Sequence, residues 1–251
     1  MQVVYINKKR IKFIVFGVVV LAAAIALFTW LAGSGKTPVV AEPIYQGADD
    51  KNLVAITVNV DWGEDVLPDM LKVLKEKDVK ATFFVTGRFA EKFPDLVKEI
   101  AADGHEIGSH GYSHPHHDQI STEENLQDIL KGETVLKSLI GKKPLLFAPA
   151  YGEHGKTCLE AAEQNGNKVI LWTADTIDWQ NPPPDQATLV QRVTGDKLHN
   201  GTIILMHPKA HTVQALPQMI DAIRDKGYTL STVSHMLEQS EAETQGESAN
   251  E

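Results

Sequence analysis

Short apolar segments that alternate with amphipathic segments constrain the fold of this chain more than any other feature. From residue 53 onward, seven runs are short, apolar and rich in β-branched or aromatic residues, which is typical of strands. These predicted strands are Val54–Val60, Ala81–Val85, His105–Gly108, Leu145–Ala148, Lys168–Thr173, Thr202–Met206 and Tyr228–Val233. Helical patterns between them include Val66–Lys77, Phe89–Ala102, Thr122–Ile140 and Ala215–Lys226. The alternation predicts an α/β domain with a parallel sheet, either open or closed into a barrel.

The N-terminal residues predict a membrane segment. A cluster of basic residues at positions 8–12 precedes an apolar run at residues 13–32 that contains no charged residue. Roughly 20 apolar residues match the thickness of the hydrocarbon core of a bilayer. Basic residues on the N-terminal side place that side in the cytoplasm. We therefore expect residues 1–12 to be cytoplasmic and residues 13–32 to form a single-pass anchor in the cell membrane, with the rest of the chain extracytoplasmic.

Cleavage of this segment as a signal peptide, followed by secretion, is the alternative, because Val39-Val40-Ala41 is an acceptable cleavage site. The apolar run is longer than the roughly 7–15 residues of a signal-peptide core, which favours the anchor. Residues 33–52 contain Gly and Pro without periodicity and predict a linker. Residues 239–251 are rich in Ser, Glu, Ala and Gln and predict a disordered tail. One domain at residues 53–238 lies between them.

Net charge and cysteine content narrow the function classes. The formal net charge is −9, and nucleic-acid binding requires a basic surface. The single cysteine, Cys158, cannot form an internal disulfide or a cysteine-based zinc site. The composition therefore excludes a nucleic-acid-binding protein and a disulfide-stabilised scaffold.

Polar side chains follow several predicted strands at the points where those strands end. His110 and His114 follow the third strand, and this spacing allows two imidazoles to share one metal ion. His207 ends the sixth strand, where a general acid or base can act. The other candidates at strand ends are Tyr151, Asp175, Asp178 and Trp179. Because the carboxyl ends of parallel strands meet at one edge of a sheet, these residues predict a common site.

Four segments carry a resemblance to a known family. They are Lys80–Val85, Gly104–His110 with His114, Asp175-Thr176-Ile177-Asp178-Trp179 and Leu205-Met206-His207. They resemble the second strand and the second, fourth and fifth motifs of the polysaccharide deacetylase family, which is also known as the NodB-homology or carbohydrate esterase family. The resemblance extends from Val54 to Leu237, and Trp62-Gly63 resembles the branch found in spore-forming bacteria.

The resemblance implies an irregular (β/α)7 barrel-like domain. It also implies N-deacetylation of an acetylated amino sugar in peptidoglycan or a chitin-like glycan, in modification of a cell wall or spore wall. In the family, one Asp and two His hold Zn2+ or another divalent metal, with an open position for water. A second Asp accepts a proton from that water, and a distant His protonates the leaving amine.

Mapped onto this chain, the resemblance makes His110 and His114 metal ligands and His207 the general acid. It makes Asp175 the residue that orients His207, and it assigns the backbone N–H of Tyr151 to the oxyanion. The residues that it places in the substrate pocket are Trp62, Asp178, Trp179 and Leu205.

The first and third family motifs differ in this chain. Aligned with Thr-Phe-Asp-Asp-Gly from Thr57, the chain has Asn59 at the position of the base and Val60 at that of the metal ligand. Ala148 replaces an Arg that pairs with the base in the family. Asp61 points to the same face as Asn59 because side chains alternate along a strand. Asp61 is therefore a candidate third ligand or base, and the alternative is a solvent-facing loop residue.

Two functions follow from these observations. The first is a metal-dependent deacetylase in which Asp61 supplies the lost carboxylate. The second is a catalytically impaired protein of the same fold that acts as a glycan-binding or scaffold protein. A purely structural role in a sporulation complex is less favoured, because a drifting site would have lost some of the polar residues at the strand ends.

Overall fold

The computed structural model describes residues 42–239, together with Val18 and Leu21. The predicted cytoplasmic segment, the rest of the predicted anchor and residues 240–251 of the predicted tail lie outside the described residues. Within the described part of the chain, no helix is both long enough and apolar enough to cross a membrane. The chain divides into two compact units, Met1–Val39 and Val40–Glu251, and the second contains the whole sheet.

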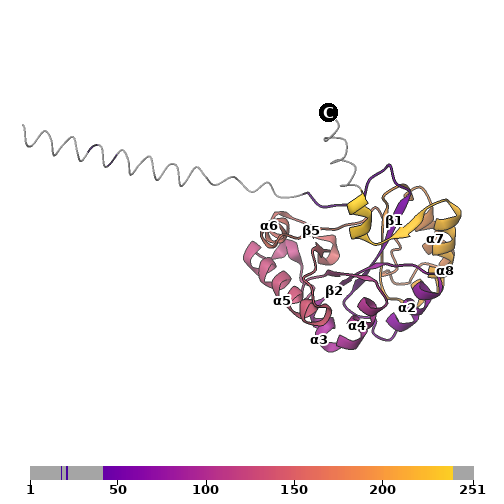
Figure 1. Cartoon of the computed structure of the whole chain (residues 1–251), viewed down its shortest axis with the longest axis horizontal. Coiled ribbons are helices and arrows are strands. Elements are labelled where there is room, and N and C mark those ends of the chain that lie inside the picture. The colour runs from indigo at the N-terminus through magenta and orange to yellow at the C-terminus, as the bar shows by residue number, and fades with distance from the viewer. Residues whose placement is uncertain (1–17, 19–20, 22–41, 240–251) are drawn as a thin grey trace, which may run out of the picture. The chain divides into compact units, whose positions relative to one another are not determined.

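Eight strands form one sheet, and every pairing between neighbouring strands is parallel. The order is β5-β4-β3-β2-β1-β7-β6, and β8 also pairs with β1. The strands are β1 (Leu53–Val60), β2 (Thr82–Val85), β3 (Glu106–Ser109), β4 (Leu146–Phe147), β5 (Lys168–Val169), β6 (Ala174–Asp175), β7 (Ile203–Met206) and β8 (Thr229–Ser231). The α/β class and the parallel sheet are confirmed, and the sheet forms a half-barrel with helices around it (Figure 1).

The fifth predicted strand, Lys168–Thr173, is two strands in the structure. β5 ends at Val169 and lies at one edge of the sheet, whereas β6 begins at Ala174 and lies at the other edge. The short connection at residues 170–173 therefore crosses the open side of the half-barrel. The continuous apolar run of Val-Ile-Leu-Trp gave no sign of this crossing, because apolar residues line both parts of the path.

Seven α-helices are present in the described residues: α2 (Leu67–Glu76), α3 (Gly87–Lys92), α4 (Pro94–Ala102), α5 (Thr122–Ile140), α6 (Lys156–Asn165), α7 (Gln186–Thr194) and α8 (Ala210–Asp225). The single helix predicted at Phe89–Ala102 is wrong, because Pro94 starts a new helix and Phe93 leaves the helical conformation. α5 has the predicted bounds and begins with a capping box between Ser121 and Glu124. α8 begins at Ala210, earlier than predicted.

The central strand, β1, separates the main core from the site. Val54, Ile56, Val58 and Val60 point to one face of β1 and pack in the main hydrophobic core with residues of α2 and α8. The residues between them point to the other face, since side chains alternate along a strand. Two of these, Thr57 and Asn59, are polar and buried. Val60 therefore belongs to the core, and Asn59 and Asp61 face away from it.

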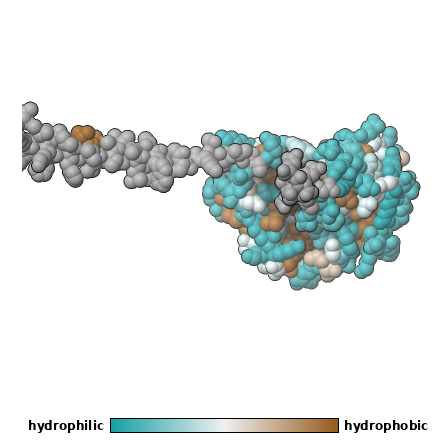
Figure 2. All heavy atoms as spheres, turned by 45° about the horizontal axis from the view of Figure 1, so that its top comes forward, coloured by the Kyte–Doolittle hydropathy of each residue, from teal (hydrophilic) through white to brown (hydrophobic). Residues whose placement is uncertain are grey.

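Part of the segment predicted to be a linker is folded onto the domain. Ile44 forms a parallel bridge with Ile170, and Gln46 forms an antiparallel bridge with Thr202. The linker prediction is thus wrong for these residues, whose backbone groups pair with the sheet. The face of the domain visible in Figure 2 is mainly hydrophilic, with apolar residues in separate spots, as is usual for a protein surface in water.

Candidate functional site

A cavity of about 420 Å³ lies at the carboxyl ends of the strands. Its floor consists of its most buried lining residues, Asn59, His110 and Leu205, which are 7%, 2% and 5% exposed. Its rim consists of its exposed aromatic residues, Trp62, Tyr151 and Trp179. The other lining residues are Asp61, His114, Gly152, Trp172, Asp175 and His207. The structure therefore brings together every predicted site residue except Asp178.

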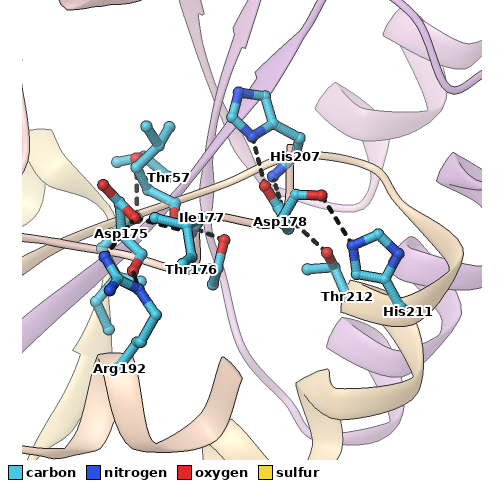
Figure 3. A network of polar contacts seen from close by, with 11 residues as sticks. Thr57, Asp175, Thr176, Ile177, Asp178, Arg192, His207, His211 and Thr212 are labelled. Atoms are coloured by element: carbon cyan, nitrogen blue, oxygen red, sulfur yellow. Dashed lines mark hydrogen bonds and ion pairs between the residues drawn. The ribbon is translucent and has the colours of Figure 1, made fainter. Parts of the chain in front are cut away.

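His207 is held by the buried carboxylate of Asp178 (Figure 3). Nδ1 of His207 lies 2.7 Å from Oδ1 of Asp178, and the backbone N–H of His207 donates to Oδ2 at 2.7 Å. Thr212 also donates to Oδ2 at 2.7 Å. Burial alone would raise the pKa of Asp178, but hydrogen bonds and charge from His207 outweigh it and lower that pKa. The contact at Nδ1 leaves Nε2 of His207 as the ring nitrogen available to a ligand.

The predicted roles of Asp175 and Asp178 need correction. We expected Asp175 to orient His207 and Asp178 to line the substrate pocket. In the structure Oδ1 of Asp175 accepts hydrogen bonds from the backbone N–H of Ile177 at 2.8 Å and from Arg192 at 3.0 Å. Asp175 lines the cavity, whereas Asp178 lies beneath His207. Figure 3 shows the two carboxylates with different neighbours, Asp175 at the end of β6 with Arg192 and Asp178 with His207 and Thr212.

The two histidines after β3 form the second polar group of the cavity. Nδ1–H of His110 donates to the carbonyl oxygen of Ala148 at 2.6 Å, which fixes the tautomer with an unprotonated Nε2. Burial, followed by the charge of His114, lowers the pKa of His110 to about 3. The rings of His110 and His114 lie edge to face with centroids 5.0 Å apart. His114 has a left-handed backbone, with φ at 58°, as does its neighbour Tyr151. Such conformations are strained outside glycine and concentrate at functional sites.

Asp61 is engaged by two residues that follow β2. Oδ1 of Asp61 accepts hydrogen bonds from Thr86 at 2.9 Å and from Nε of Arg88 at 2.6 Å, and Arg88 also pairs with Oδ2. Burial alone would raise the pKa of Asp61, but hydrogen bonds from Arg88 and Thr86 hold that pKa below its usual value. The expected solvent-facing alternative for Asp61 is therefore not what the structure shows. The carboxylate is ionised and forms a two-pronged ion pair.

Trp62 lies over His207 at the rim. The two rings are stacked, with centroids 5.8 Å apart and planes 18° apart. Nζ of Lys209 lies 4.1 Å from the centroid of the Trp62 ring, within cation–π range. Gly63 makes this approach possible, since its φ is 96° and an added Cβ would lie 2.6 Å from Pro208. The loops after β1 and β7 are thus packed closely together around the Trp62 indole.

The cavity lining corrects our alignment of the first family motif. Val60 is in the core, and Asp61 and Trp62 are the successive residues that reach the cavity. Shifting Thr-Phe-Asp-Asp-Gly by two residues places its two carboxylates on Asp61 and Trp62 and its glycine on Gly63. Asp61 then occupies the position of the base, and Trp62 that of the metal ligand. The expected loss of the base is therefore corrected, whereas Ala148 still replaces the Arg of the third motif; Arg88, in helix α3, contacts Asp61 instead.

The described residues do not fit the three-ligand metal site implied by the family. Among them, no group of three or more His, Cys, Asp or Glu side chains is arranged to hold a metal ion. His110 and His114 remain as two imidazole donors. Asp61 is paired with Arg88, and the indole of Trp62 offers no lone pair for coordination. Zinc was expected from the resemblance, and the chemistry of this donor set does not support it.

Several residues that build the site were missed from the sequence. Arg88 and Thr86 lie just past the carboxyl end of β2, so the rule that identified His110 and His207 would also have identified them. Trp172 lies on the crossing between β5 and β6 and was assigned to a strand interior. Arg192 and Thr212 act from helices α7 and α8, and no local motif marks them.

Comparison with known proteins identifies the family. The chain matches the family model described as polysaccharide deacetylase over residues 46–170. A peptidoglycan-N-acetylglucosamine deacetylase of Bacillus cereus (strain ATCC 14579) is 36% identical over 201 residues, covering 78% of this chain and 72% of that protein. The chain belongs to the polysaccharide deacetylase family. Its sheet and cavity are therefore those of a family of hydrolases that includes named cell-wall deacetylases.

One further relative and one solved structure are similar to this chain over most of its length. YlxY of Bacillus subtilis (strain 168) is 41% identical over 198 residues, covering 79% of this chain and 61% of that protein. The chain thus spans less than two thirds of that relative. The solved structure of BA3943 of Bacillus anthracis, described as a CE4 family pseudoenzyme, has a TM-score of 0.74 and 36% identity, covering 78% of this chain and 69% of that one. The family therefore contains both named deacetylases and a named pseudoenzyme of similar fold.

Proposed function

We propose that this domain binds an N-acetylated amino-sugar glycan, such as peptidoglycan, and holds it without efficient deacetylation. The observation that carries the proposal is the position of Trp62, which stands where the family has a metal-binding carboxylate and stacks on His207. A catalytic metal site in this family needs that carboxylate beside two imidazoles. Replacing this carboxylate by an indole removes a metal ligand and adds an aromatic surface.

The rim of the cavity supports glycan binding. Trp62, Tyr151 and Trp179 present aromatic rings to solvent around one opening. Aromatic side chains supply large apolar contact area and rigid faces, and exposing three of them at one site is costly without a ligand to cover them. Pyranose rings in the chair form offer C–H faces that such side chains can cover. The relative named as a peptidoglycan-N-acetylglucosamine deacetylase supports a cell-wall glycan as the ligand.

The test measures binding and turnover on the same samples. We expect the full-length protein to co-sediment with purified peptidoglycan, to bind the N-acetylglucosamine tetramer in calorimetry, and to release no acetate above the buffer level. Trp179→Ala should weaken binding, whereas Leu145→Ala should not, because Leu145 is 63% exposed and precedes β4 at the opposite end of the sheet. Absence of binding to both glycans by the unmodified protein would overturn the proposal.

A metal-dependent deacetylase is the second candidate function. It is favoured by one observation, the retention of Asp61, His110, His114 and His207 around a single cavity. Its test is acetate release from acetylated oligomers with zinc, cobalt or manganese added. Release that requires both the metal and Asp61 would establish this candidate and displace the first.

We also propose that residues 13–32 anchor the protein in the cell membrane and hold the domain on the outer side, next to the cell wall. The length and the basic flank of the apolar run support this placement. Protease treatment of intact cells with the wall removed tests it. Degradation of the domain, with a short N-terminal fragment kept in the membrane, is expected. Recovery of the domain in the medium would instead support a cleaved signal peptide.

A further inference from the structure

The segment at residues 42–47, which we call the strap, pairs with both sides of the open half-barrel. The N–H of Ile44 donates to the carbonyl oxygen of Val169 in β5 at 2.8 Å. The N–H of Gly47 donates to the carbonyl oxygen of Gly201, just before β7, at 2.8 Å. β5 forms one edge of the sheet, and β7 neighbours β6, which forms the other edge. The strap therefore spans the opening between the two edges.

The strap also supports the crossing segment that carries Trp172. The hydroxyl of Thr173 donates to the backbone carbonyl oxygen of Tyr45 at 2.8 Å. Ile44 and Trp172 both pack against the hydrophobic cluster that contains Ile170. Because Trp172 lines the cavity, the position of this cavity residue depends in part on contacts that the strap makes.

A chain of hydrogen bonds joins the strap to the turn that presents Tyr151. Nδ1 of His154 lies 2.6 Å from the carbonyl oxygen of Gly152, and a carbonyl can only accept, so Nδ1 carries the proton. In the neutral ring Nε2 then accepts from the hydroxyl of Tyr45, at 3.0 Å. Gly152 directly follows Tyr151 and lies against Trp172, since an added Cβ would be 2.6 Å from that indole. The chain of hydrogen bonds thus ends between two aromatic residues that line the cavity.

The turn at Tyr151 requires support from outside. Tyr151 and Gly152 both have left-handed backbone conformations, with φ at 59° and 68°. For Tyr151 this conformation is strained and persists only where the surrounding structure holds it. The two backbone hydrogen bonds within the turn are long, at 3.2 Å and 3.1 Å. One additional hydrogen bond from outside the turn therefore changes its conformational population by a measurable factor.

We propose that the strap is coupled to the cavity and that Tyr45 is the positioning residue that transmits the coupling. With the strap docked, Tyr151 and Trp172 are held in the arrangement that binds glycan, and undocking of the strap lowers glycan affinity. Such coupling is reciprocal, so a bound glycan stabilises the docked strap by the same factor. The inference rests on the proposed glycan-binding function and adds a means by which the segment that follows the proposed anchor acts on the site.

Removal of one hydroxyl group tests the coupling. Calorimetric titrations use the full-length protein and the N-acetylglucosamine tetramer. Tyr45→Phe keeps the ring against His154 and loses the hydrogen bond. It should bind the tetramer about threefold more weakly, as expected for one partly exposed hydrogen bond.

Tyr228→Phe is the matched control. It removes the same group from a partly buried tyrosine just before β8, at the opposite end of the sheet from the cavity. Its affinity for the tetramer should equal that of the unmodified protein.

Hydrogen exchange of the same proteins follows the turn and the strap separately. Without ligand, the amides of Gly152 and Glu153 should exchange faster in Tyr45→Phe than in the unmodified protein or in Tyr228→Phe. With the tetramer bound, the amides of Ile44 and Gly47 in the unmodified protein should exchange about threefold more slowly, because the coupling is reciprocal. Amides that exchange by local opening of an uncoupled strap would not respond to the ligand.

The outcomes separate the inference from the proposed function. Equal tetramer affinity in Tyr45→Phe and the unmodified protein, or strap amides that do not respond to the bound tetramer, would overturn the inference and leave glycan binding intact. Unchanged exchange at Gly152 and Glu153 in Tyr45→Phe would overturn it without any ligand. Binding of the tetramer by none of the three proteins would instead overturn the proposed function and, with it, the coupling.

Discussion

The two halves of the cavity differ in how completely their polar groups are paired. On the side of β6 and β7, Asp178 accepts from the ring and the backbone of His207 and from Thr212 within one buried cluster. On the side of β1, Asn59 has an unpartnered oxygen, and Asp61 pairs with an arginine that is half exposed. The first half thus holds His207, the expected acid, through Asp178 and not through Asp175 as expected. In the second half, Trp62 stands at the position where the family has a metal-binding carboxylate.

This difference indicates which features the fold itself requires. Asp178 accepts hydrogen bonds from the backbone just past β7 and from the Thr212 side chain of α8, so its loss would disturb packing as well as the site. The residues after β1 extend beyond the strand and contribute little to the core. They can change without unfolding the domain. Retention of His207 is therefore weak evidence for catalysis, because its partner also supports the structure.

The largest expected effect comes from removing the buried carboxylate. Asp178→Ala should lower the free energy of unfolding by about 3 kcal/mol, because it leaves several buried donors without an acceptor. Asp61→Ala should cost only about 1 kcal/mol, because Arg88 can be solvated when its partner is lost. Urea unfolding of both variants measures the two losses. Equal losses would mean that the two halves do not differ in structural importance.

The next effect concerns the missing metal ligand. Trp62→Asp restores a carboxylate at the shifted motif position and should raise zinc affinity by roughly 100-fold, since three protein ligands replace two. Competition with a zinc-sensitive dye measures the affinity. Adding His114→Ala to this variant should remove the gain. If Trp62→Asp leaves zinc affinity unchanged, the alignment that places Trp62 at the metal position is wrong.

A smaller effect is expected at the rim. Tyr151→Ala should weaken binding of the N-acetylglucosamine tetramer by about fivefold, because an aromatic face worth about 1 kcal/mol is lost. His116 stacks on Tyr151 with centroids 4.2 Å apart, so His116→Ala should have a similar but weaker effect through the orientation of the ring. Titration calorimetry compares the two. An effect of His116→Ala larger than that of Tyr151→Ala would show that Tyr151 is not the contacting residue.

The smallest effect is the dependence of stability on acid pH. The pKa values of Asp178 and Asp61 both lie below the usual value in the folded protein. A carboxyl of this kind contributes stability above its unfolded pKa, near 4, and the contribution is lost as the pH falls through the lower folded pKa. Urea midpoints should therefore fall below about pH 4. The fall should be shallower in Asp178→Asn, and an unchanged slope would contradict the pairing of Asp178.

The strands and the residues at their ends could largely be predicted from the sequence, because each strand is a short apolar run that polar residues follow directly. His110, His114 and His207 follow apolar strands directly, and the structure places all three at one cavity. The alignment of Asn59 failed for a physical reason, since a two-residue shift along a strand keeps the same face and leaves the alternation unchanged. The roles of Asp175 and Asp178 could not be predicted, because the path of the backbone between these two residues decides which neighbours each carboxylate meets. The partners Arg88, Arg192 and Thr212 lie far away in sequence, so only the fold reveals them.

The placement of the tryptophans has a practical consequence. Of the four in the chain, Trp62, Trp172 and Trp179 all line the cavity, and Trp30 lies outside the described residues. Ultraviolet emission from the folded domain therefore originates almost entirely at the cavity. A ligand that excludes water from these indoles, or that reorients them, will shift the emission spectrum. Binding can therefore be followed without an added label. The protein thus carries its own optical probe, suited to screening glycan fragments in plates before any calorimetry is attempted.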